Sequence, residues 1–390
     1  MKNKRGKLFW IIFIPFLFTG CFNSGVVPPV VDKGTSWTVM VFMNGDNDLY
    51  KYAWRDFNSL EKVGSTDQVK VIVQFDSLGG EAARYLVKKD AFPNLVTSPV
   101  LEYLGEVNMG DALELADFVR FCAENYPADK YALIIWDHGT GFKNKDISFD
   151  FSPEDAITIP ELGMALSLST MYLGKKIDFL GMDACLMAMM EVAYEVKNHA
   201  RVMVTSQELV PGEGWNYEAI LRGLVSRPMM GERDLARLVV NSYIDYYPVG
   251  SLTQSAIDLG GISSLGKALD ELSRDILNDS LTSPLVYLSL GDSAVFFGDA
   301  DYVDLGSLVS LFSQDSRVKS EKVRESARLV QERLERCVIY ERASGEMAGN
   351  ARGLSIYFPY FPYNSKYDDL AFSRDTHWDE MIKYLSQWRR

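Results

Sequence analysis

The stretch Ile177-Asp-Phe-Leu-Gly-Met-Asp-Ala-Cys185 is a short apolar run that ends in an acid, an alanine and a thiol. Such a run is typical of a buried strand, and Cys185 would then follow the strand's carboxyl end. The stretch Tyr131-Ala-Leu-Ile-Ile-Trp-Asp-His-Gly139 repeats the pattern with an imidazole in place of the thiol. Near-continuous apolar runs indicate parallel strands that are covered on both faces.

Strand-like and helix-like segments alternate through the first two thirds of the chain. Further strand-like runs are residues 37–43, 69–75 and 202–205, with a lesser pair at 83–87 and 101–104. Helix-like segments are residues 49–63, 111–126, 159–173 and 187–198, and residues 139–156 are expected to form a polar loop. This alternation predicts an α/β fold, a mainly parallel central sheet flanked by helices as an α/β/α sandwich. Because sites in such sheets lie at the carboxyl ends of the strands, His138 and Cys185 are expected at one edge, on neighbouring strands.

The pattern changes after about residue 260. Helical segments at 263–277 and 320–336 mix with short strands expected at 294–297, 338–340 and 354–358. We interpret residues 261–390 as a C-terminal α+β subdomain that packs against the core formed by residues 36–260.

The N-terminus is expected to be a targeting segment rather than part of the fold. Four basic residues precede the 11-residue apolar run 8–18, which is shorter than the roughly 20 residues that span a bilayer. This combination is typical of a secretory signal. Because Cys21 directly follows Gly20, residues 1–21 resemble a bacterial lipoprotein signal with Cys21 as the lipidated residue. The alternative is an ordinary signal peptide in which the cysteine occurs by chance. Residues 22–35 are expected to form a tether between the anchor and the domain.

These features predict an exported protein anchored to a bacterial membrane, on the periplasmic or the extracellular face. The formal net charge is −13, and no run of Lys and Arg occurs beyond the first seven residues. Binding to nucleic acid is therefore not expected.

Of the four cysteines, the three beyond Cys21 are an odd number, which allows a free reactive thiol in an exported protein. Cys122 falls on the apolar side of a helix and Cys337 opens an apolar run, so both are expected in the core. Cys185 is the cysteine at a strand end.

A thiol and an imidazole at neighbouring strand ends are what a cysteine peptidase needs. The thiolate attacks, and a nearby imidazole, here His138, raises the thiolate fraction and later protonates the leaving amine. The backbone amides of Gly139 and Cys185 are candidates for the oxyanion hole. A helix expected from Met187 would further favour the thiolate through its N-terminal dipole. Neither His199 nor His377 has a comparable partner, and zinc-ligand, P-loop and dinucleotide motifs are absent from the sequence.

With these residues in view, the sequence resembles the clostripain family of cysteine peptidases, in the caspase-like clan. The resemblance covers about residues 36–390 and would make 36–260 a caspase-like catalytic core. The blocks that carry it, in family order, are Trp37-Thr-Val-Met-Val-Phe-Met-Asn-Gly-Asp-Asn-Asp-Leu49, Trp136-Asp-His-Gly-Thr-Gly-Phe142, Gly181-Met-Asp-Ala-Cys-Leu-Met187, Ser206-Gln-Glu-Leu-Val-Pro-Gly-Glu-Gly-Trp-Asn-Tyr217 and Ala351-Arg-Gly-Leu-Ser-Ile-Tyr-Phe-Pro359.

The resemblance implies cleavage after Arg or Lys in protein or peptide substrates. A cationic P1 side chain needs a carboxylate at the floor of its pocket, and Asp183 matches the family's acidic position. Alternatively, Asp183 is an acid at the end of a strand that accepts hydrogen bonds from the backbone amides of a loop. Glu213 is the candidate for a second pocket acid, with Glu208 as its competitor.

Some family members are activated by cleavage in the loop after the histidine motif. Lys143 and Lys145 lie in that loop and would suit self-processing within residues 143–156, or they are ordinary solvated charges.

The type member of the family depends on calcium. The acids that could bind it here are Asp46, Asp48, Asp146 and Asp150, but their spacing is not that of an EF-hand. We expect no required cofactor or metal, and a monomer.

Two further readings remain open. The first is a non-catalytic surface lipoprotein that uses a peptidase-like fold as a binding module. The second is a peptidase of the same fold with a different P1 preference.

Overall fold

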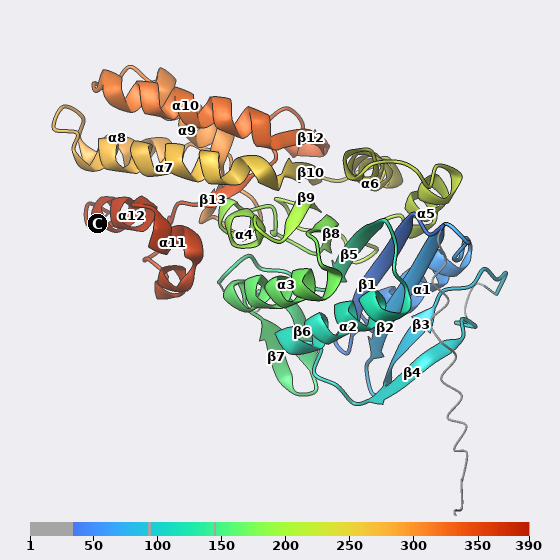
Figure 1. Ribbon diagram of the computed structural model, residues 1–390. Coiled ribbons are helices and arrows are strands. Elements are labelled where there is room, and N and C mark those ends of the chain that lie inside the picture. The colour runs from blue at the N-terminus through green and yellow to red at the C-terminus, as the bar shows by residue number, and fades with distance from the viewer. Residues whose placement is uncertain (1–33, 93–94, 144–145, 390) are drawn as a thin grey trace, which may run out of the picture. The chain divides into compact units, whose positions relative to one another are not determined.

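The computed structural model of this chain describes residues 34–92, 95–143 and 146–389 (Figure 1). These residues belong to one compact unit. The predicted signal, Cys21 and most of the tether, as well as Lys145, lie outside the described residues. None of the helices in the described segments combines the length and apolarity that a bilayer span requires.

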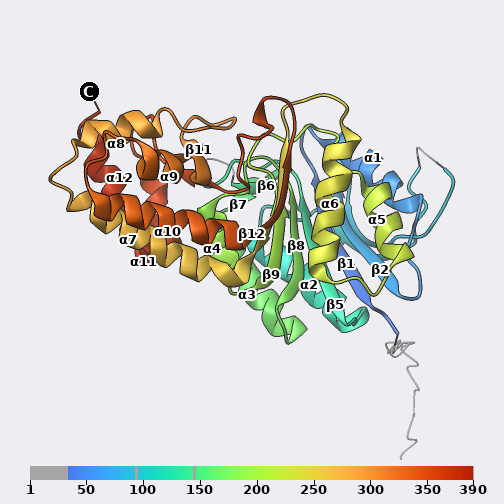
Figure 2. The ribbon, with the colours of Figure 1, turned by 90° about the horizontal axis from the view of Figure 1, so that it is seen from above.

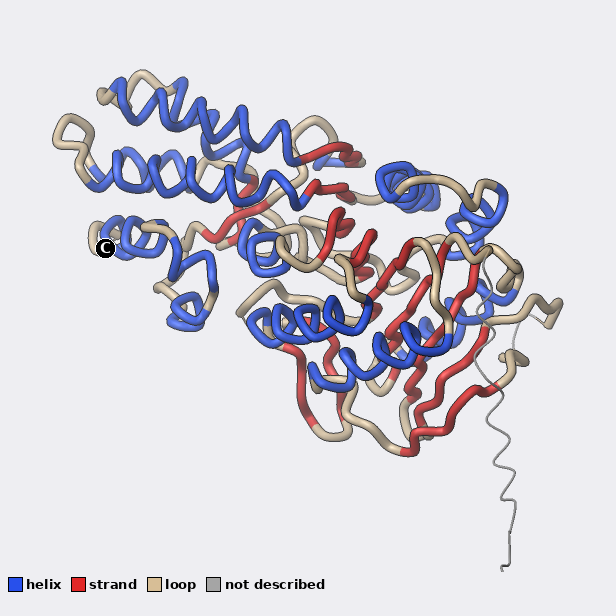
Figure 3. Tube along the Cα trace, in the orientation of Figure 1, coloured by secondary structure: helices blue, strands red, loops and turns tan. Residues whose placement is uncertain are grey.

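The main sheet carries the site at one of its edges. Among the described residues nine strands form it, in the order β12-β10-β9-β8-β5-β1-β2-β3-β4. Figure 3 shows the strands of the sheet lying side by side between helices. They are β1 (Trp37–Gly45), β2 (Val69–Ser77), β3 (Ala82–Leu86), β4 (Val100–Gly105), β5 (Lys130–Trp136), β8 (Ile177–Asp183), β9 (Ala200–Thr205), β10 (Thr253–Asp258) and β12 (Val338–Ala343). The central strands β9, β8, β5, β1 and β2 run parallel, and the flanking pairs are antiparallel. The predicted α/β class with a mainly parallel sheet is confirmed.

Helices cover both faces of this sheet, as Figures 1 and 2 show. They are α1 (Tyr50–Glu61), α2 (Ala112–Asn125), α3 (Ile159–Leu173), α4 (Met190–Val196), α5 (Tyr217–Ser226) and α6 (Glu232–Tyr246). Side chains alternate along a strand, so Met40 and Phe42 pack in the cluster with α2, α3 and α4. Val39 and Val41 pack on the other face, with α1, α5 and α6.

The expected polar loop at 139–156 is in part a hairpin, which corrects that prediction. It contains β6 (Ile147–Phe151) and β7 (Glu154–Ile157). Two polar residues of β6 are buried because distant backbone groups satisfy them. The Ser148 hydroxyl donates to Met109 O at 2.8 Å, and Asp150 Oδ2 accepts from Met109 N at 2.7 Å. Sequence polarity suggested a loop because these partners are far away in the chain.

The C-terminal region contributes to the sheet and surrounds α4. It contains α7 (Ile262–Leu277), α8 (Pro284–Gly291), β11 (Tyr302–Asp304), α9 (Leu305–Gln314), α10 (Glu321–Cys337), β13 (Ser355–Tyr357), α11 (Ala371–Asp375) and α12 (Trp378–Ser386). The expected strand at 294–297 is wrong, because only Phe296 there makes a bridge, to Val303.

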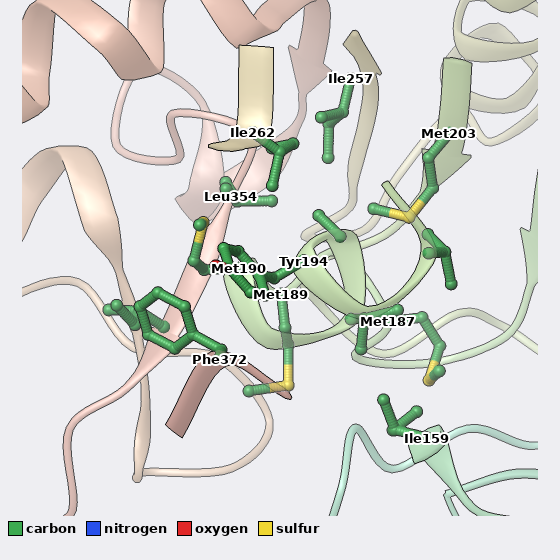
Figure 4. Packing of buried hydrophobic residues seen from close by; sticks show 14 of the residues in the cluster. Ile159, Met187, Met189, Met190, Tyr194, Met203, Ile257, Ile262, Leu354 and Phe372 are labelled. Atoms are coloured by element: carbon green, nitrogen blue, oxygen red, sulfur yellow. The ribbon is translucent and has the colours of Figure 1, made fainter. Parts of the chain in front are cut away.

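One apolar cluster joins the C-terminal region to the segment that follows Cys185. Figure 4 shows Met189 and Met190 on the side of Leu354 and Phe372 from the C-terminal region, whereas Met187 lies toward Ile159. All of these residues belong to the same buried apolar cluster. Met189 also makes a parallel bridge with Ser355. The position of the chain just after the thiol therefore depends on residues more than 150 positions later.

Candidate active site

Strand register brings His138 and Cys185 to the same edge of the sheet. Trp136 at the end of β5 pairs with Asp183 at the end of β8, so each functional residue lies two positions beyond a paired strand end. The predicted adjacency of the two strands is confirmed. His138 and Cys185 both line a pocket of about 230 Å³.

Four adjacent strand ends supply the walls of this pocket. Strand β1 leads to Leu49, β5 to Trp136 and His138, β8 to Cys185, and β9 to the loop that holds Val210. Parallel strands end on one side of a sheet, which explains why residues far apart in sequence meet here. Besides these residues, the lining consists of Asp137, Asp183, Ala184, Leu209, Pro211, Gly212 and Gly214.

The Cys185 thiol is half-buried and accepts a hydrogen bond from Val210 N at 3.2 Å. Burial raises the pKa of this thiol above its ordinary value, the Val210 amide lowers it, and the negative charges of Asp183, Glu208 and Asp137 raise it further. The resting site therefore favours the neutral thiol, and a base is needed to generate the thiolate.

The expected start of the helix at Met187 is wrong, although a helix does lie within the predicted range 187–198. Helix α4 begins at Met190, because Leu186 has a φ of 60° and Met189 is extended in its bridge with Ser355. The nearest helix thus begins five residues after the thiol and has seven residues. Its dipole acts within about one turn of its end, so it does not explain a thiolate at Cys185.

His138 is held by an acid from the neighbouring strand end. Its Nε2 lies 2.9 Å from Asp48 Oδ1, and the imidazole side chain is 35% exposed. Among the described residues, the sulfur of Cys185 has its hydrogen bonds with Val210, so imidazole and thiol are not hydrogen-bonded to each other in this state. Catalytic hydrogen bonds are often long before substrate binds. From its sequence position Asp48 is identifiable only as a possible calcium ligand, because its proximity to His138 depends on the pairing of β1 with β5.

Gly139 lies directly against the backbone of Cys185. A Cβ at this position would be 2.5 Å from the carbonyl oxygen of Cys185 and 2.9 Å from Cγ of Met187. Only glycine permits this approach without displacement. The two amides named as oxyanion donors therefore belong to neighbouring backbone segments.

Asp183 lines the pocket and is 4% exposed. Its Oδ2 accepts from Trp215 N and from Tyr217 Oη, each at 2.9 Å. Its Oδ1 is buried and has no hydrogen-bond partner in the described part of the chain. Burial raises the pKa of Asp183 to about 7, and the bonds from Trp215 and Tyr217 lower it.

Gly214 allows the backbone to approach this carboxylate. A Cβ there would be 2.6 Å from Oδ2 of Asp183, and the residue has a φ of +56°. Two further buried acids surround the pocket. Asp56 accepts from Trp136 Nε1 at 2.8 Å, and Asp137 accepts from Asn47 Nδ2 at 2.7 Å. Burial raises the pKa of both, and Asp183 contributes to the rise at Asp56. A cation bound in the pocket would stabilise the ionised forms of these carboxyl groups.

The two glutamates proposed as a second pocket acid have other partners. Glu213 Oε1 lies 3.7 Å from Arg55 Nη1, with 41% of its side chain exposed, while its neighbours Gly212 and Gly214 line the pocket. Glu208 accepts from its adjacent amide, Leu209 N, at 2.7 Å. This placement gives most support to Asp183 as the acid that contacts a P1 side chain.

Lys143 is not a solvated charge, which corrects one of the two readings for this residue. Its Nζ lies 2.7 Å from Asp299 Oδ1 and 2.6 Å from Asp301 Oδ2, and its side chain is 12% exposed. Lys145 is outside the described residues.

The four acids considered as calcium ligands do not converge. Asp46 and Asp150 interact, Asp48 contacts His138, and Asp146 Oδ2 accepts from Ile159 N at 2.9 Å. Over residues 34–92, 95–143 and 146–389, no group of three or more acids, histidines or cysteines could hold a metal ion. The expectation that no metal is required stays a prediction.

The remaining cysteines and histidines are placed away from this chemistry. Cys122 and Cys337 are buried in the apolar core, as predicted. His377 Nδ1 lies 2.7 Å from Asp270 Oδ1, and His199 is half-buried just before β9.

A thiol and an imidazole at adjacent ends of parallel strands, beside a buried carboxylate, are the groups that a cysteine hydrolase with an α/β fold requires. The sequence model of the clostripain family, Peptidase C11, matches residues 41–388. The chain therefore belongs to the clostripain family, and the resemblance inferred from its motifs is confirmed.

Individual relatives agree with this membership. Clostripain of Hathewaya histolytica is 27% identical over 230 residues, 48% of this chain. The match spans 42% of that relative, less than half of its length.

Two solved structures show the same fold. A secreted C11 cysteine protease from Bacteroides thetaiotaomicron, in complex with an irreversible peptide inhibitor, has a TM-score of 0.67 at 21% identity, covering 90% of this chain and 99% of its own. An inactive zymogen C11 protease from Parabacteroides distasonis has a TM-score of 0.69 at 21% identity, covering 88% and 98%.

Proposed function

We propose that this chain is an exported cysteine endopeptidase that cleaves peptide bonds after Lys or Arg, with Cys185 as nucleophile and His138 as base. The observation that carries the proposal is Asp183, which lines the same pocket as Cys185 and whose buried Oδ1 has no hydrogen-bond partner among the described residues. A buried carboxylate oxygen without a partner is costly, and a lysine or arginine side chain would supply the missing donor and charge.

The pocket suits the whole length of such a side chain. Leu49, Trp136, Val210 and Pro211 provide apolar walls for the methylene stem. Asp183 provides the ion-pair partner for its charged end. Glu213 would act only from outside this lining, as a more distant acid.

The reaction follows from the positions of three groups. His138 takes the thiol proton of Cys185, and the sulfur attacks the carbonyl carbon of the scissile bond. The oxyanion that forms would accept from the amides of Gly139 and Cys185. His138 then gives its proton to the leaving amine, and the C–N bond breaks. Water, deprotonated by the same imidazole, hydrolyses the acyl-enzyme and restores the thiol.

Replacement of Asp183 by asparagine tests the specificity. Fluorogenic peptides with Lys, Arg, Asp or Leu at P1 are compared for wild type, Asp183→Asn and Cys185→Ala. Because a hydrogen bond to a charged group contributes about 1.5–3 kcal/mol, kcat/KM for the Lys and Arg peptides should fall by roughly 10- to 150-fold in Asp183→Asn.

The matched control is Asp178→Asn, which changes a buried acid at the other end of β8. It should leave the P1 preference unchanged. Unaltered Lys and Arg turnover in Asp183→Asn would favour a different P1 preference, and full turnover by Cys185→Ala would refute the nucleophile.

The non-catalytic binding module is separated from the enzyme by an active-site label. An arginyl chloromethyl ketone should alkylate Cys185 in the wild-type protein and not in His138→Ala. A protein that binds peptides but never reacts with this reagent would support the binding module.

We propose in addition that the protein processes itself within the loop 143–156 and is lipidated at Cys21. Both loop cleavage and lipidation can be measured by intact-mass spectrometry of the wild-type protein and of Cys185→Ala, each produced in a bacterium that lipidates exported proteins. A loop cut should disappear in Cys185→Ala, and a diacylglycerol mass should disappear in Cys21→Ala. Activity in the presence of EDTA should equal that without it, because we propose that no metal is required.

A further inference from the structure

Lys143 occupies a site made by the C-terminal region. Its Nζ donates to both carboxylate oxygens of Asp299, at 2.7 and 2.8 Å, and to Asp301 Oδ2 at 2.6 Å. The ammonium also lies 4.8 Å from the ring centre of Tyr302 and 5.7 Å from that of Tyr357. Two carboxylates and two aromatic rings therefore surround one cation, which is a strong arrangement when it is shielded from water.

The three residues before Lys143 are fixed to the same region. Tyr302 Oη donates to the carbonyl oxygen of Thr140 at 2.8 Å. A Cβ on Gly141 would be 2.7 Å from that same hydroxyl. Phe142 is 1% exposed, and its ring centre lies 5.0 Å from that of Tyr357. The chain from Thr140 to Lys143 thus begins two residues after His138 and contacts the C-terminal region at every position.

The two acids that bind Lys143 are fixed in turn by hydrogen bonds from backbone amides. Asp301 Oδ1 accepts from Tyr360 N at 2.7 Å and from Phe361 N at 3.0 Å, and Asp299 Oδ1 accepts from Asp301 N at 2.9 Å. Asp301 is 3% exposed. Because these carboxylates cannot easily move, they define the position of Lys143 rather than follow it.

The same segment also contacts the opposite wall of the pocket. The amide of Gly298 donates to the Glu208 carboxylate, and a Cβ on Gly298 would be 2.7 Å from Cγ of Leu209. Leu209 lines the pocket next to Val210, whose amide donates to Cys185. Residues 298–302 therefore join the loop of the imidazole to the loop that contacts the thiol.

We propose that Lys143 is a positioning residue for His138 and not a self-cleavage point. The Lys143 clamp, defined as Lys143, Asp299 and Asp301, holds the loop that places the imidazole and the Gly139 amide. This inference rests on the proposed function, since it assigns a role to Lys143 in the same reaction. According to this proposal, catalysis also requires residues 299–301 of the C-terminal region, because they hold Lys143 in place.

Cleavage after Lys143 would conflict with this arrangement. A P1 lysine must place its ammonium at Asp183 and its carbonyl carbon at the Cys185 sulfur. Lys143 would have to leave two carboxylates, one of them buried, and removing one partner of such a cluster is strongly unfavourable. Phe142 would also have to leave the aromatic core.

The test compares Lys143→Met, which keeps most of the length of the side chain and removes its charge, with Lys143→Arg. Lys383→Met is the matched control, because Lys383 also pairs with two acids, Asp368 at 2.7 Å and Asp379 at 2.9 Å. It also lies 4.8 Å from a tyrosine ring centre, that of Tyr363. Two readouts are taken on the full mature chain. They are kcat and KM for a Lys peptide, and the rate of Cys185 alkylation by iodoacetamide across pH, followed by mass spectrometry of the Cys185 peptide.

A displaced imidazole should lower kcat more than KM. We expect kcat of Lys143→Met to fall by about 10- to 100-fold with KM changed less than threefold, since small misplacement of a catalytic group has effects of this size. The alkylation profile should move to higher pH, because His138 no longer supports the thiolate. Lys143→Arg should recover most of both values, and Lys383→Met should match wild type.

Two results would overturn the proposal. One is a Lys143→Met protein with kcat within twofold of wild type and an unchanged alkylation profile. The other is a wild-type fragment that ends at Lys143 and whose formation is blocked in Lys143→Met. If wild type cleaves no basic peptide, the proposed function fails, whereas the alkylation profile still decides whether the clamp positions His138.

Discussion

At the scale of single residues, the proposed role of Asp183 in P1 recognition would make specificity depend on pH. Burial raises its pKa to about 7, so the free enzyme holds this carboxyl largely protonated below that pH. Only the ionised form pairs with a P1 cation. Burial also raises the pKa of Cys185. Ionisation of Asp183 and ionisation of Cys185 would both increase turnover as pH rises, so the total rate alone does not separate them.

A ratio of substrates isolates Asp183 in the pH dependence. We predict that kcat/KM for a Lys peptide, divided by kcat/KM for its Gln analogue, rises about tenfold per unit as pH increases toward 7 and then levels. The thiol contributes equally to both peptides and cancels. In Asp183→Asn the ratio should be flat between pH 5 and 9, and a flat ratio in wild type would contradict the assignment.

Asp48 is the second residue whose role can be measured. It is 69% exposed as a side chain, so its interaction with His138 is screened by water. An exposed pair contributes up to about 1 kcal/mol, and we predict that Asp48→Asn lowers kcat/KM by up to roughly fivefold. Because this is an electrostatic interaction at the protein surface, the loss should shrink in 1 M NaCl. Asp67→Asn, an exposed acid outside the pocket lining, should have no effect, and equal losses in both would argue against a specific role.

At the scale of elements, the loop after His138 is fixed at both ends. One end is the Lys143 clamp, and the other is Asp146, which accepts from the first amide of α3. Helix α3 begins with a capping box in which Thr158 accepts from Glu161 N and Glu161 Oε2 accepts from Thr158 N. These hydrogen bonds provide acceptors for backbone amides at the start of the helix, which have no partner within the helix itself.

Loss of this cap should cost stability and leave catalysis intact. We predict that Thr158→Ala lowers the free energy of unfolding by about 1 kcal/mol, measured by urea denaturation. The control is Thr170→Ala on the same helix, where alanine is the better helix former, so its cost should be smaller. Equal or reversed costs for the two variants would show that the capping box does not stabilise α3.

At the scale of the whole molecule, buried acids set a stability cost that depends on pH. Asp76 is 0% exposed, and neither of its carboxylate oxygens has a hydrogen-bond partner among the described residues. Burial, followed by the charges of Asp150, Glu106 and Asp46, raises its pKa to about 8. The folded state therefore binds a proton that the unfolded chain, with an Asp pKa of about 3.9, releases.

Stability should fall as pH rises between these two values. With more protons bound in the folded state, the free energy of unfolding decreases from about pH 4 to about pH 8 and is then constant for this group. We predict that Asp76→Asn is more stable than wild type at pH 8, by an amount on the order of a few kcal/mol, and that the difference shrinks toward pH 5. Urea denaturation measures this difference in the free energy of unfolding. EDTA is included to remove divalent cations, which would compensate the charge of the ionised Asp76. A pH-independent difference would show that Asp76 ionises normally in the fold.

Much of the fold and of the pair of functional residues could be predicted from sequence. Buried parallel strands carry continuous apolar runs, so the ends of β5 and β8 were identifiable from residues 131–136 and 177–182 alone. His138 and Cys185 follow those ends directly. The hairpin at 147–157 could not be predicted, because Ser148 and Asp150 look solvated until Met109 is brought to them.

The sequence by itself determined the fold class, the family and the two residues at the strand ends, because these depend on local patterns and on motifs that stay contiguous in the chain. Only the tertiary structure decided the state of those residues. It placed Asp48 against the imidazole, raised the pKa of Cys185 by burial, and left one oxygen of Asp183 without a partner in the described segments. It also placed Lys143 beside acids some 156 positions away. Such contacts depend on which surfaces pack together, and no local pattern contains that information.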